Sequence, residues 1–222
     1  MKEKKNNEKP NTKKVLNKKL LVAGISFTLF VVLTILVLLK VTNKIDLAIE
    51  SYMISIRNET LTNFMIIITN IGGSYSLISL TFLAMLIAII KQKRLPLNTM
   101  INLVIVFLTS QLFKYIIHRP RPTGVFLTHA TGYSYPSGHT MVSFAFFVFI
   151  ACSLCEKVNN KTLKLLIKIL TAILVITISF SRIYLGVHYL TDIIGSYLLG
   201  TTYLMIFLNI RATYIKKRIK WK

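Results

Sequence analysis

The chain has 222 residues, of which 54% are hydrophobic and 16% charged, and its 28 Lys and Arg against 7 Asp and Glu give a formal net charge of +21. This much apolar surface excludes disorder for most of the chain, and two cysteines exclude a disulfide framework. A soluble nucleic-acid-binding protein would explain the charge, but the cations lie in the two tails and between runs of 17–20 mostly apolar residues. That pattern is typical of a protein that crosses a membrane several times, so we expect membrane lipids and no nucleic acid as partners.

The first predicted span is Leu20–Leu39, which has twenty residues and no charge. At about 1.5 Å rise per residue it reaches about 30 Å, the thickness of the hydrocarbon core. The run is too long for a signal-peptide core, and no small-residue cleavage site follows it, so we expect an uncleaved span. The preceding residues 1–19 hold eight Lys. We expect them to form a disordered tail that either attracts anionic lipid or only fixes the topology.

Five further spans follow in the sequence, which predicts an all-α fold with six transmembrane helices around a helical core. Their ranges are Ser74–Ile90, Asn98–Ile117, Ser137–Cys155, Leu163–Phe180 and Tyr189–Leu208. The apolar run Leu61–Ile71 precedes the first of these, and Gly72-Gly73 is expected to break it from the span. The membrane domain then covers residues 20–210.

The connection between the first two spans has hydrophobic residues at helical spacing from Ile45 to Ile56, with Asp46, Glu50 and Arg57 on other faces. This periodicity predicts an amphipathic helix lying on the membrane surface. A connecting helix that packs on protein without touching lipid is the alternative.

Four groups of cations indicate the orientation. They lie in the tail 1–19, after the second span, between the fourth and fifth spans, and in the basic tail 211–222. With six spans all four groups fall on one side of the membrane, which the positive-inside rule makes cytoplasmic. We therefore expect a multi-pass protein of the cell membrane with both termini in the cytoplasm.

The remaining ionisable residues gather at span ends in three segments, 114–122, 136–139 and 181–192. Because odd spans run outward and even spans inward, all three segments are expected to meet at the extracytoplasmic face. Four cations there share one nearby carboxylate, and such an imbalance in a membrane protein indicates a functional site. The cations are Lys114, Arg119, Arg121 and Arg182, and the carboxylate is Asp192. Snorkelling to headgroups explains one or two cations, but four together predict a bound anion such as phosphate.

The sequence Pro-Ser-Gly-His predicts an anion site at a helix N-terminus. Pro136 suits the start of a helix, with Ser137 as its N-cap. The free N–H groups of Ser137, Gly138 and His139 are then expected to face outward, where Gly138 allows an anion to approach closely.

His188 and Asp192 are four residues apart and therefore share one face of a helix. A carboxylate in that position accepts a hydrogen bond from one imidazole nitrogen, fixes the tautomer and leaves the other nitrogen free to attack. His139 is then available as a general acid for the leaving group.

Together these segments resemble the three-part signature of the type-2 phosphatidic acid phosphatase family, which shares its catalytic core with vanadium haloperoxidases and glucose-6-phosphatase. The family pattern is Lys, six residues, Arg-Pro; then Pro-Ser-Gly-His; then Ser-Arg, five residues, His, three residues, Asp. The matching residues are Lys114, Arg121 and Pro122; Pro136 to His139; and Ser181, Arg182, His188 and Asp192. Order and spacing agree throughout the core motifs 114–192.

The resemblance implies a bacterial membrane lipid phosphatase that works through a phosphohistidine. His188 would be the nucleophile, Asp192 would orient it, and His139 would protonate the leaving group and then activate water. The residues expected to hold the phosphoryl oxygens are Lys114, Arg121, Ser137, Gly138 and Arg182. Fixed cations stabilise the charge of phosphoryl transfer, so we expect no metal and no other cofactor.

The expected substrate is a lipid phosphate or diphosphate of the outer leaflet: undecaprenyl diphosphate, phosphatidylglycerol phosphate, phosphatidic acid or lysophosphatidic acid. A phosphotransferase of the same mechanism is the first alternative. A transporter or a non-catalytic lipid-binding protein is the second, although a transporter is expected to place its charges near the bilayer midplane. The sequence does not predict an oligomeric state.

Several residues near the motifs keep two interpretations. Arg119 lies outside the family pattern and either helps to bind the phosphate or headgroup or faces solvent. The loop Thr123–Tyr135, which contains His129, either roofs the site or only packs on the protein. Cys152 and Cys155 form a Cys-x-x-Cys, for which apolar packing is a better explanation than redox chemistry.

Overall fold

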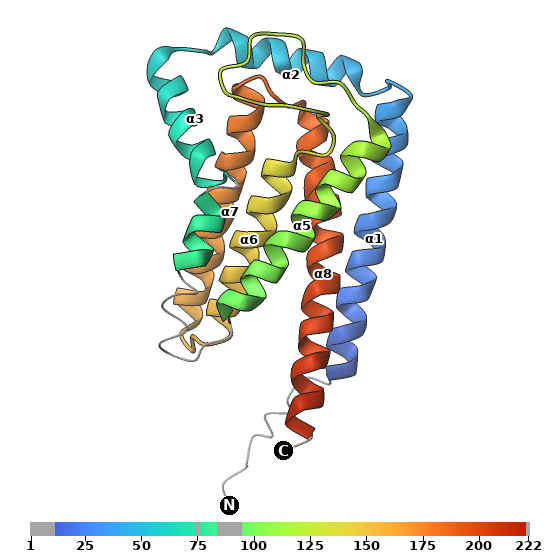
Figure 1. Ribbon diagram of the computed structural model, residues 1–222, viewed down its shortest axis with the longest axis vertical. Helices are drawn as coiled ribbons and strands as arrows, with labels where there is room; N and C mark the ends of the chain where they lie inside the picture. The colour runs from blue at the N-terminus through green and yellow to red at the C-terminus, as the bar shows by residue number, and fades with distance from the viewer. Residues whose placement is uncertain (1–11, 74–75, 84–94, 221–222) are drawn as a thin grey trace, which may run out of the picture.

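The computed structural model describes residues 12–73, 76–83 and 95–220, and every regular element in these ranges is a helix. The helices form an elongated bundle with α2 lying across one end (Figure 1). Their bounds are α1 Thr12–Leu38, α2 Asn43–Ser55, α3 Glu59–Ile71, α5 Leu95–Ile117, α6 Gly138–Cys155, α7 Lys161–Tyr184 and α8 Leu190–Lys220. The predicted all-α membrane fold is confirmed.

Five helices, α1, α5, α6, α7 and α8, are long and apolar enough to cross a membrane. A sixth crossing is formed if α3 and the helix Ser76–Leu83 count as one span, which bends by 45° between them. The bend contains Gly72-Gly73, where the sequence predicts a break. The apolar run Leu61–Ile71 therefore lies in the first helix of a bent pair that forms either a broken span or a re-entrant loop. Of the predicted span Ser74–Ile90, positions 74–75 and 84–90 lie outside the described residues.

Two helices extend further than the predicted spans. α1 begins at Thr12, so residues 12–19 are helical where the sequence predicts a disordered tail. α8 continues to Lys220, twelve residues beyond the predicted end at Leu208. The helical backbone satisfies its own hydrogen bonds past the hydrocarbon core, and Lys is a good helix former.

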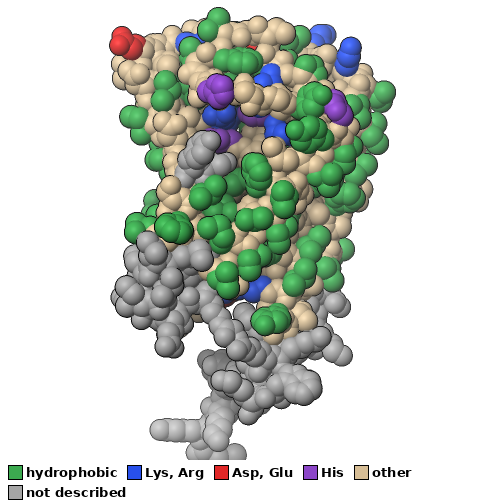
Figure 2. Space-filling model, in the orientation of Figure 1, with side chains coloured by type: hydrophobic (Ala, Val, Ile, Leu, Met, Phe, Trp, Pro, Cys, Tyr) green, Lys and Arg blue, Asp and Glu red, His purple; other side chains and the backbone are tan. Residues whose placement is uncertain are grey.

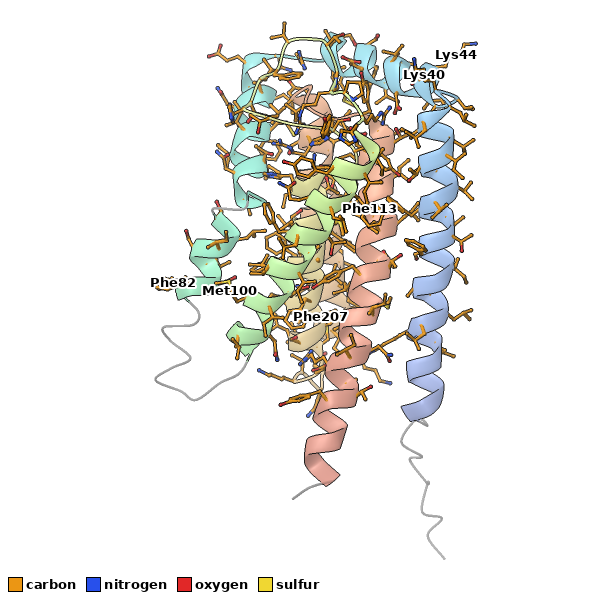
Figure 3. All side chains as sticks on the ribbon, turned by 45° about the vertical axis from the view of Figure 1, so that its right-hand side comes forward. Lys40, Lys44, Phe82, Met100, Phe113 and Phe207 are labelled. Carbon is orange, nitrogen blue, oxygen red and sulfur yellow. The ribbon has the colours of Figure 1, made fainter. Side chains whose placement is uncertain are left out.

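The core of the bundle is built around α6, which packs on α5, α7 and α8, while α1 packs along α8 (Figure 1). Phe30 of α1 is 1% exposed, and its ring meets the ring of Phe113 edge-on with centroids 5.2 Å apart. Phe113 reaches this contact from α5 (Figure 3). The outer faces carry exposed hydrophobic side chains such as Leu29 and Ile35, as expected for helices surrounded by lipid.

α2 covers the end of the bundle and packs on the ends of α7 and α8 (Figure 1). It buries Asp46 and Met53 against the protein and leaves Ile45 and Tyr52 exposed. The helix predicted between the first two spans is therefore present, but it contacts protein through its polar Asp46. The loop between α5 and α6 passes across α2 (Figure 1), where Gly124 lies against Glu50 and Ile54. The three motif segments meet at this end of the bundle.

Candidate active site

A cavity of about 780 Å³ opens at the end of the bundle that α2 covers. Basic and His side chains gather in a hollow on this part of the surface (Figure 2). Six of the eight site residues predicted from the sequence line it: Lys114, Arg121, Gly138, His139, Arg182 and His188. The other two, Ser137 and Asp192, are fully buried and absent from its lining. Segments far apart in the sequence thus form one basic cavity.

His188 lies in the short connection between α7 and α8, with Asp192 in the first turn of α8. Its Nδ1 is 3.2 Å from Oδ2 of Asp192, and that oxygen also accepts from the backbone N–H of Tyr189 at 2.9 Å. Since a carboxylate only accepts, Nδ1 carries the proton and Nε2 holds the lone pair. The lone pair faces Arg121, whose Nη1 is 3.2 Å from Nε2.

Burial lowers the pKa of His188 well below its ordinary value of 6.5, and nearby Lys114, Arg121 and Arg182 lower it further. Desolvation and neighbouring positive charge both disfavour the imidazolium. His188 is therefore neutral at pH 7, as an attacking nitrogen must be.

Arg121 is held in place by backbone carbonyl oxygens. It donates to Thr131 O at 2.7 Å, to Gly132 O at 3.0 Å and to Val187 O at 2.7 Å. Lys114 behaves similarly, because its Nζ donates to the carbonyl oxygens of Tyr133 and Ser134. Both cations therefore donate hydrogen bonds to neutral carbonyl oxygens beside the cavity.

Thr69 of α3 contacts two of the predicted site residues. Its Oγ1 accepts from Nη1 of Arg182 at 2.8 Å, and its carbonyl oxygen lies 2.7 Å from Nε2 of His139. Because a carbonyl only accepts, Nε2 of His139 carries a proton and Nδ1 is its other titrating position. The Nε of Arg182 is buried and has no hydrogen-bond partner among the described residues.

The start of α6 differs in part from the expected anion site. Ser137 is the N-cap, and its Oγ accepts from the N–H of Thr140 at 3.4 Å. However, its own N–H is directed at the carbonyl oxygen of Asp192, 3.3 Å away, so it does not face the cavity. Gly138 does line the cavity, and a Cβ there would lie 3.0 Å from Ser110 Oγ.

Arg119 does not line this cavity, and the expectation that it faces solvent is wrong. It is 9% exposed, and Nη1 donates to Asp192 Oδ1 at 2.6 Å and to Thr191 Oγ1 at 2.7 Å. Nη2 donates to Asp46 Oδ2 at 2.7 Å. The ring of Tyr189 covers the guanidinium, 4.4 Å from its carbon to the ring centroid. Arg119 therefore joins α2 to the carboxylate that contacts His188.

Asp46 is a site residue that sequence reasoning misses. It is 1% exposed and also accepts from the N–H of Thr191 at 3.1 Å and from its Oγ1 at 2.7 Å. The expectation that Asp192 is the one carboxylate near the four cations is therefore wrong. A single Asp in a connecting helix gives no local signal of this role, because its partners are more than seventy residues away.

The loop Thr123–Tyr135 contributes to both predicted roles. Its part 128–133 lines the cavity, including His129 and Tyr133. Tyr135 instead packs in the core against Phe30, with centroids 5.8 Å apart. His118, at the end of α5, is exposed and stacks edge-on with Tyr133. Among the described residues, no group of three or more His, Cys, Asp or Glu is arranged to hold a metal ion.

A family model described as the PAP2 superfamily matches residues 94–216. The chain is 30% identical over 194 residues to phosphatidylglycerophosphatase B of Bacillus subtilis, covering 84% of this chain and 91% of that protein. It is 27% identical over 173 residues to undecaprenyl-diphosphatase of Sulfolobus acidocaldarius, covering 72% and 76%.

Two crystal structures are similar to this fold. The transmembrane PAP2-type phosphatidylglycerolphosphate phosphatase of Bacillus subtilis superposes with a TM-score of 0.80 and 25% identity, covering 86% of this chain and 96% of that one. Aquifex aeolicus LpxE has a TM-score of 0.56 and 24% identity, covering 74% and 94%, and supports the fold alone.

Proposed function

Because the chain belongs to the PAP2 superfamily and resembles its membrane phosphatases, we propose that it hydrolyses the terminal phosphate of a lipid phosphate or diphosphate through a phosphohistidine at His188. The observation that carries this proposal is the state of His188: a buried, neutral imidazole with Nδ1 held by Asp192 and Nε2 at a basic cavity. Such an imidazole is an activated nucleophile.

In the first step, Nε2 of His188 forms a bond to phosphorus and the bond from phosphorus to the lipid oxygen breaks. The leaving oxygen takes a proton from His139. Since Nε2 of His139 donates to the Thr69 carbonyl, the transferred proton comes from Nδ1 of the doubly protonated ring. In the second step, neutral His139 takes a proton from water through Nδ1, and the water oxygen forms a bond to phosphorus. The bond between phosphorus and Nε2 of His188 breaks, which releases phosphate and restores neutral His188.

Lys114, Arg121 and Arg182 are the cations proposed to hold the phosphoryl oxygens, with the N–H of Gly138. The buried Nε of Arg182 has no hydrogen-bond partner within residues 12–73, 76–83 and 95–220, and such a donor suits an oxygen of the substrate. Fixed cations around the equatorial oxygens stabilise the charge of the transition state. They are already in place, whereas water molecules would have to reorient to give the same stabilisation. The N–H of Ser137 is engaged by the carbonyl oxygen of Asp192, which leaves its hydroxyl as the group proposed to contact the phosphate.

The relatives suggest the substrate class: one is named for phosphatidylglycerol phosphate and one for undecaprenyl diphosphate. Phosphatidic acid has the same terminal phosphate and completes the set that we propose. From the positive-inside distribution of cations we infer that both termini lie in the cytoplasm and that the cavity opens at the extracytoplasmic face. A cysteine in the loop 123–135, in a chain without Cys152 and Cys155, should then react with an impermeant reagent on intact cells. Labelling only after lysis contradicts this orientation.

Phosphate release from the three lipids, measured with purified protein in detergent and excess chelator, tests the reaction. We expect activity that survives the chelator and disappears in His188→Ala. His118→Asn is the matched control, because His118 is exposed outside the cavity at a φ of 53° that Asn tolerates. Full activity in His188→Ala, or a strict metal requirement, contradicts the proposal. Transfer of labelled phosphate to an added alcohol in preference to water identifies a phosphotransferase.

A further inference from the structure

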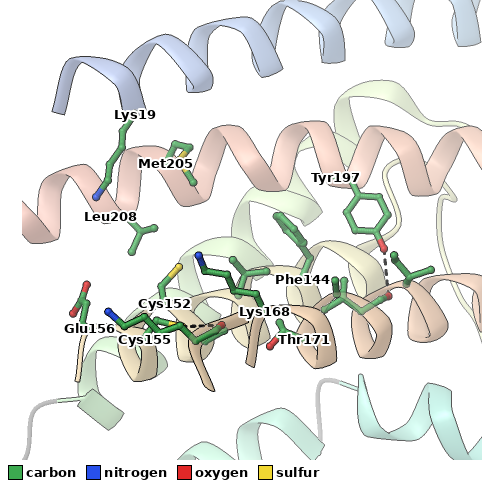
Figure 4. A pocket seen from close by; sticks show the side chains of 16 residues that line it. Lys19, Phe144, Cys152, Cys155, Glu156, Lys168, Thr171, Tyr197, Met205 and Leu208 are labelled. Atoms are coloured by element: carbon green, nitrogen blue, oxygen red, sulfur yellow. Dashed lines mark hydrogen bonds between the residues drawn. The ribbon is translucent and has the colours of Figure 1, made fainter. Parts of the chain in front are cut away.

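A second cavity, of about 860 Å³, lies at the opposite end of the bundle and shares no lining residue with the first. Its walls come mostly from α6, α7 and α8, and α1 contributes Lys19 (Figure 4). α7 and α8 are joined by a short connection at the end that α2 covers, and each packs closely on α6. The cavity lies between α7 and α8 toward the ends of these helices that are farther from α2.

The two ends of this cavity differ in chemistry. Lys19, Lys168 and Glu156 lie at one end, and Tyr197 lies at the other (Figure 4). The Tyr197 hydroxyl contacts Ser179 Oγ at 2.7 Å, which closes the space between α7 and α8. The wall between the ends is mostly apolar, and its members include Phe144, Val148, Ile176, Met205 and Leu208.

The charged end has an excess of cations. Lys19, Lys164 and Lys168 all line it, and none forms an ion pair among the residues that the structure describes. The one carboxylate there, Glu156, is paired with Arg211 at 3.2 Å. The three lysines therefore lack a counter-charge.

We propose that this cavity binds an anionic phospholipid of the leaflet opposite the proposed active site. Its acyl chain lies along α6 between α7 and α8, and its phosphate lies among Lys19, Lys164 and Lys168. An apolar cavity of several hundred cubic ångströms with a few polar groups at one end has the form of a ligand site. A chain of methylene groups fills it better than water, and each lysine near a membrane surface attracts anionic lipid.

Titration of the purified full chain with phosphatidylglycerol and phosphatidylcholine, followed by native mass spectrometry, measures the lipid preference. Each lysine is expected to contribute about fivefold to the preference for phosphatidylglycerol. Lys164→Gln with Lys168→Gln should therefore lower the preference by about 25-fold. The matched control is Lys157→Gln with Lys161→Gln, which removes the same charge from the same end of the bundle at positions outside the lining. That pair should keep the preference.

The two native cysteines locate the bound lipid, because Cys152 and Cys155 both line the cavity and are the two cysteines of the chain. In vesicles that contain phosphatidylglycerol, their alkylation by neutral N-ethylmaleimide should be slower than in pure phosphatidylcholine. The protection should disappear with Lys164→Gln and Lys168→Gln and persist in the control pair. The proposal is overturned if both lipids are retained equally. It is also overturned if the protection is unchanged by Lys164→Gln with Lys168→Gln, or if glycerol phosphate alone protects the cysteines. Phosphatase activity is measured in parallel, so loss of the first site is distinguishable from loss of the second.

Discussion

Arg119 donates to Oδ1 of Asp192 at 2.6 Å, on the oxygen opposite the one that contacts His188. Both oxygens of the buried carboxylate are therefore engaged, and its orientation is fixed. The other end of the guanidinium bonds to Asp46 on α2. In this way a helix outside the sequence motifs positions the residue that orients the proposed nucleophile.

Removing this guanidinium should damage both stability and activity. Arg119→Gln leaves Asp46 and Asp192 buried without a cation, and loss of one partner of a buried pair costs about 3–5 kcal/mol. We expect a lower melting temperature and a lower kcat with little change in KM, measured by thermal denaturation and phosphate release in detergent. Arg57→Gln is the control, since Arg57 bonds to the carbonyls of Tyr184 and Val125 and touches neither carboxylate. Wild-type kcat in Arg119→Gln contradicts the positioning role.

Thr69→Val should separate the binding of phosphate from the chemistry. The change removes the Oγ1 that accepts from Arg182 and that lies 3.4 Å from Nε2 of His139, and it keeps the carbonyl oxygen 2.7 Å from that nitrogen. A hydrogen bond to a charged group is worth about 1.5–3 kcal/mol, so kcat/KM should fall at least about tenfold, mostly through KM. Thr62→Val, on the same helix, removes a contact to Tyr184 away from the cavity and should leave KM unchanged. A fall confined to kcat excludes this role for Thr69.

Gly138→Ala should reduce activity by crowding α5. The added Cβ would lie 3.0 Å from Ser110 Oγ and 3.6 Å from Lys114 Cε. Displacement of a group near the reacting atoms by about 1 Å can cost about 100-fold in rate. Adding Ser110→Gly should restore much of kcat/KM, which a steady-state assay of the double variant measures. Gly24→Ala is the control, because nothing lies within 4 Å of its Cβ.

The acid limb of the pH profile of kcat/KM should lie below pH 6.5. Burial and nearby cations lower the pKa of His188, so its attacking nitrogen stays unprotonated until the pH falls well below the ordinary value of 6.5. Lys114→Gln removes one of those cations, so the pKa of His188 should rise and the limb should move to higher pH. The pH at which kcat/KM falls to half of its maximum gives the position of the limb, and this pH does not depend on how low the maximum is in the variant. A limb that moves to lower pH contradicts the assignment to His188.

The spacing within each motif predicted most of the site. The four-residue interval between His188 and Asp192 and the convergence of three span ends need only helix geometry and chain direction. Asp46 and Thr69 are not predicted because each acts through partners seventy or more residues away. An Asp in a connecting helix or a Thr in an apolar run gives no local signal of such a role. Ser137 was assigned correctly as a cap, but its N–H points to Asp192, which sequence cannot show.

The carbonyl oxygens that hold Arg121 and Lys114 have a consequence for substrate entry. These cations are occupied before substrate arrives, but by neutral groups of one loop instead of carboxylates. An incoming phosphate then exchanges weak acceptors for a doubly charged one and breaks no ion pair. A neutral headgroup has no charged acceptor to replace the carbonyl oxygens. The loop therefore favours charged lipids, because its carbonyl oxygens bind Arg121 and Lys114 more weakly than a phosphate does.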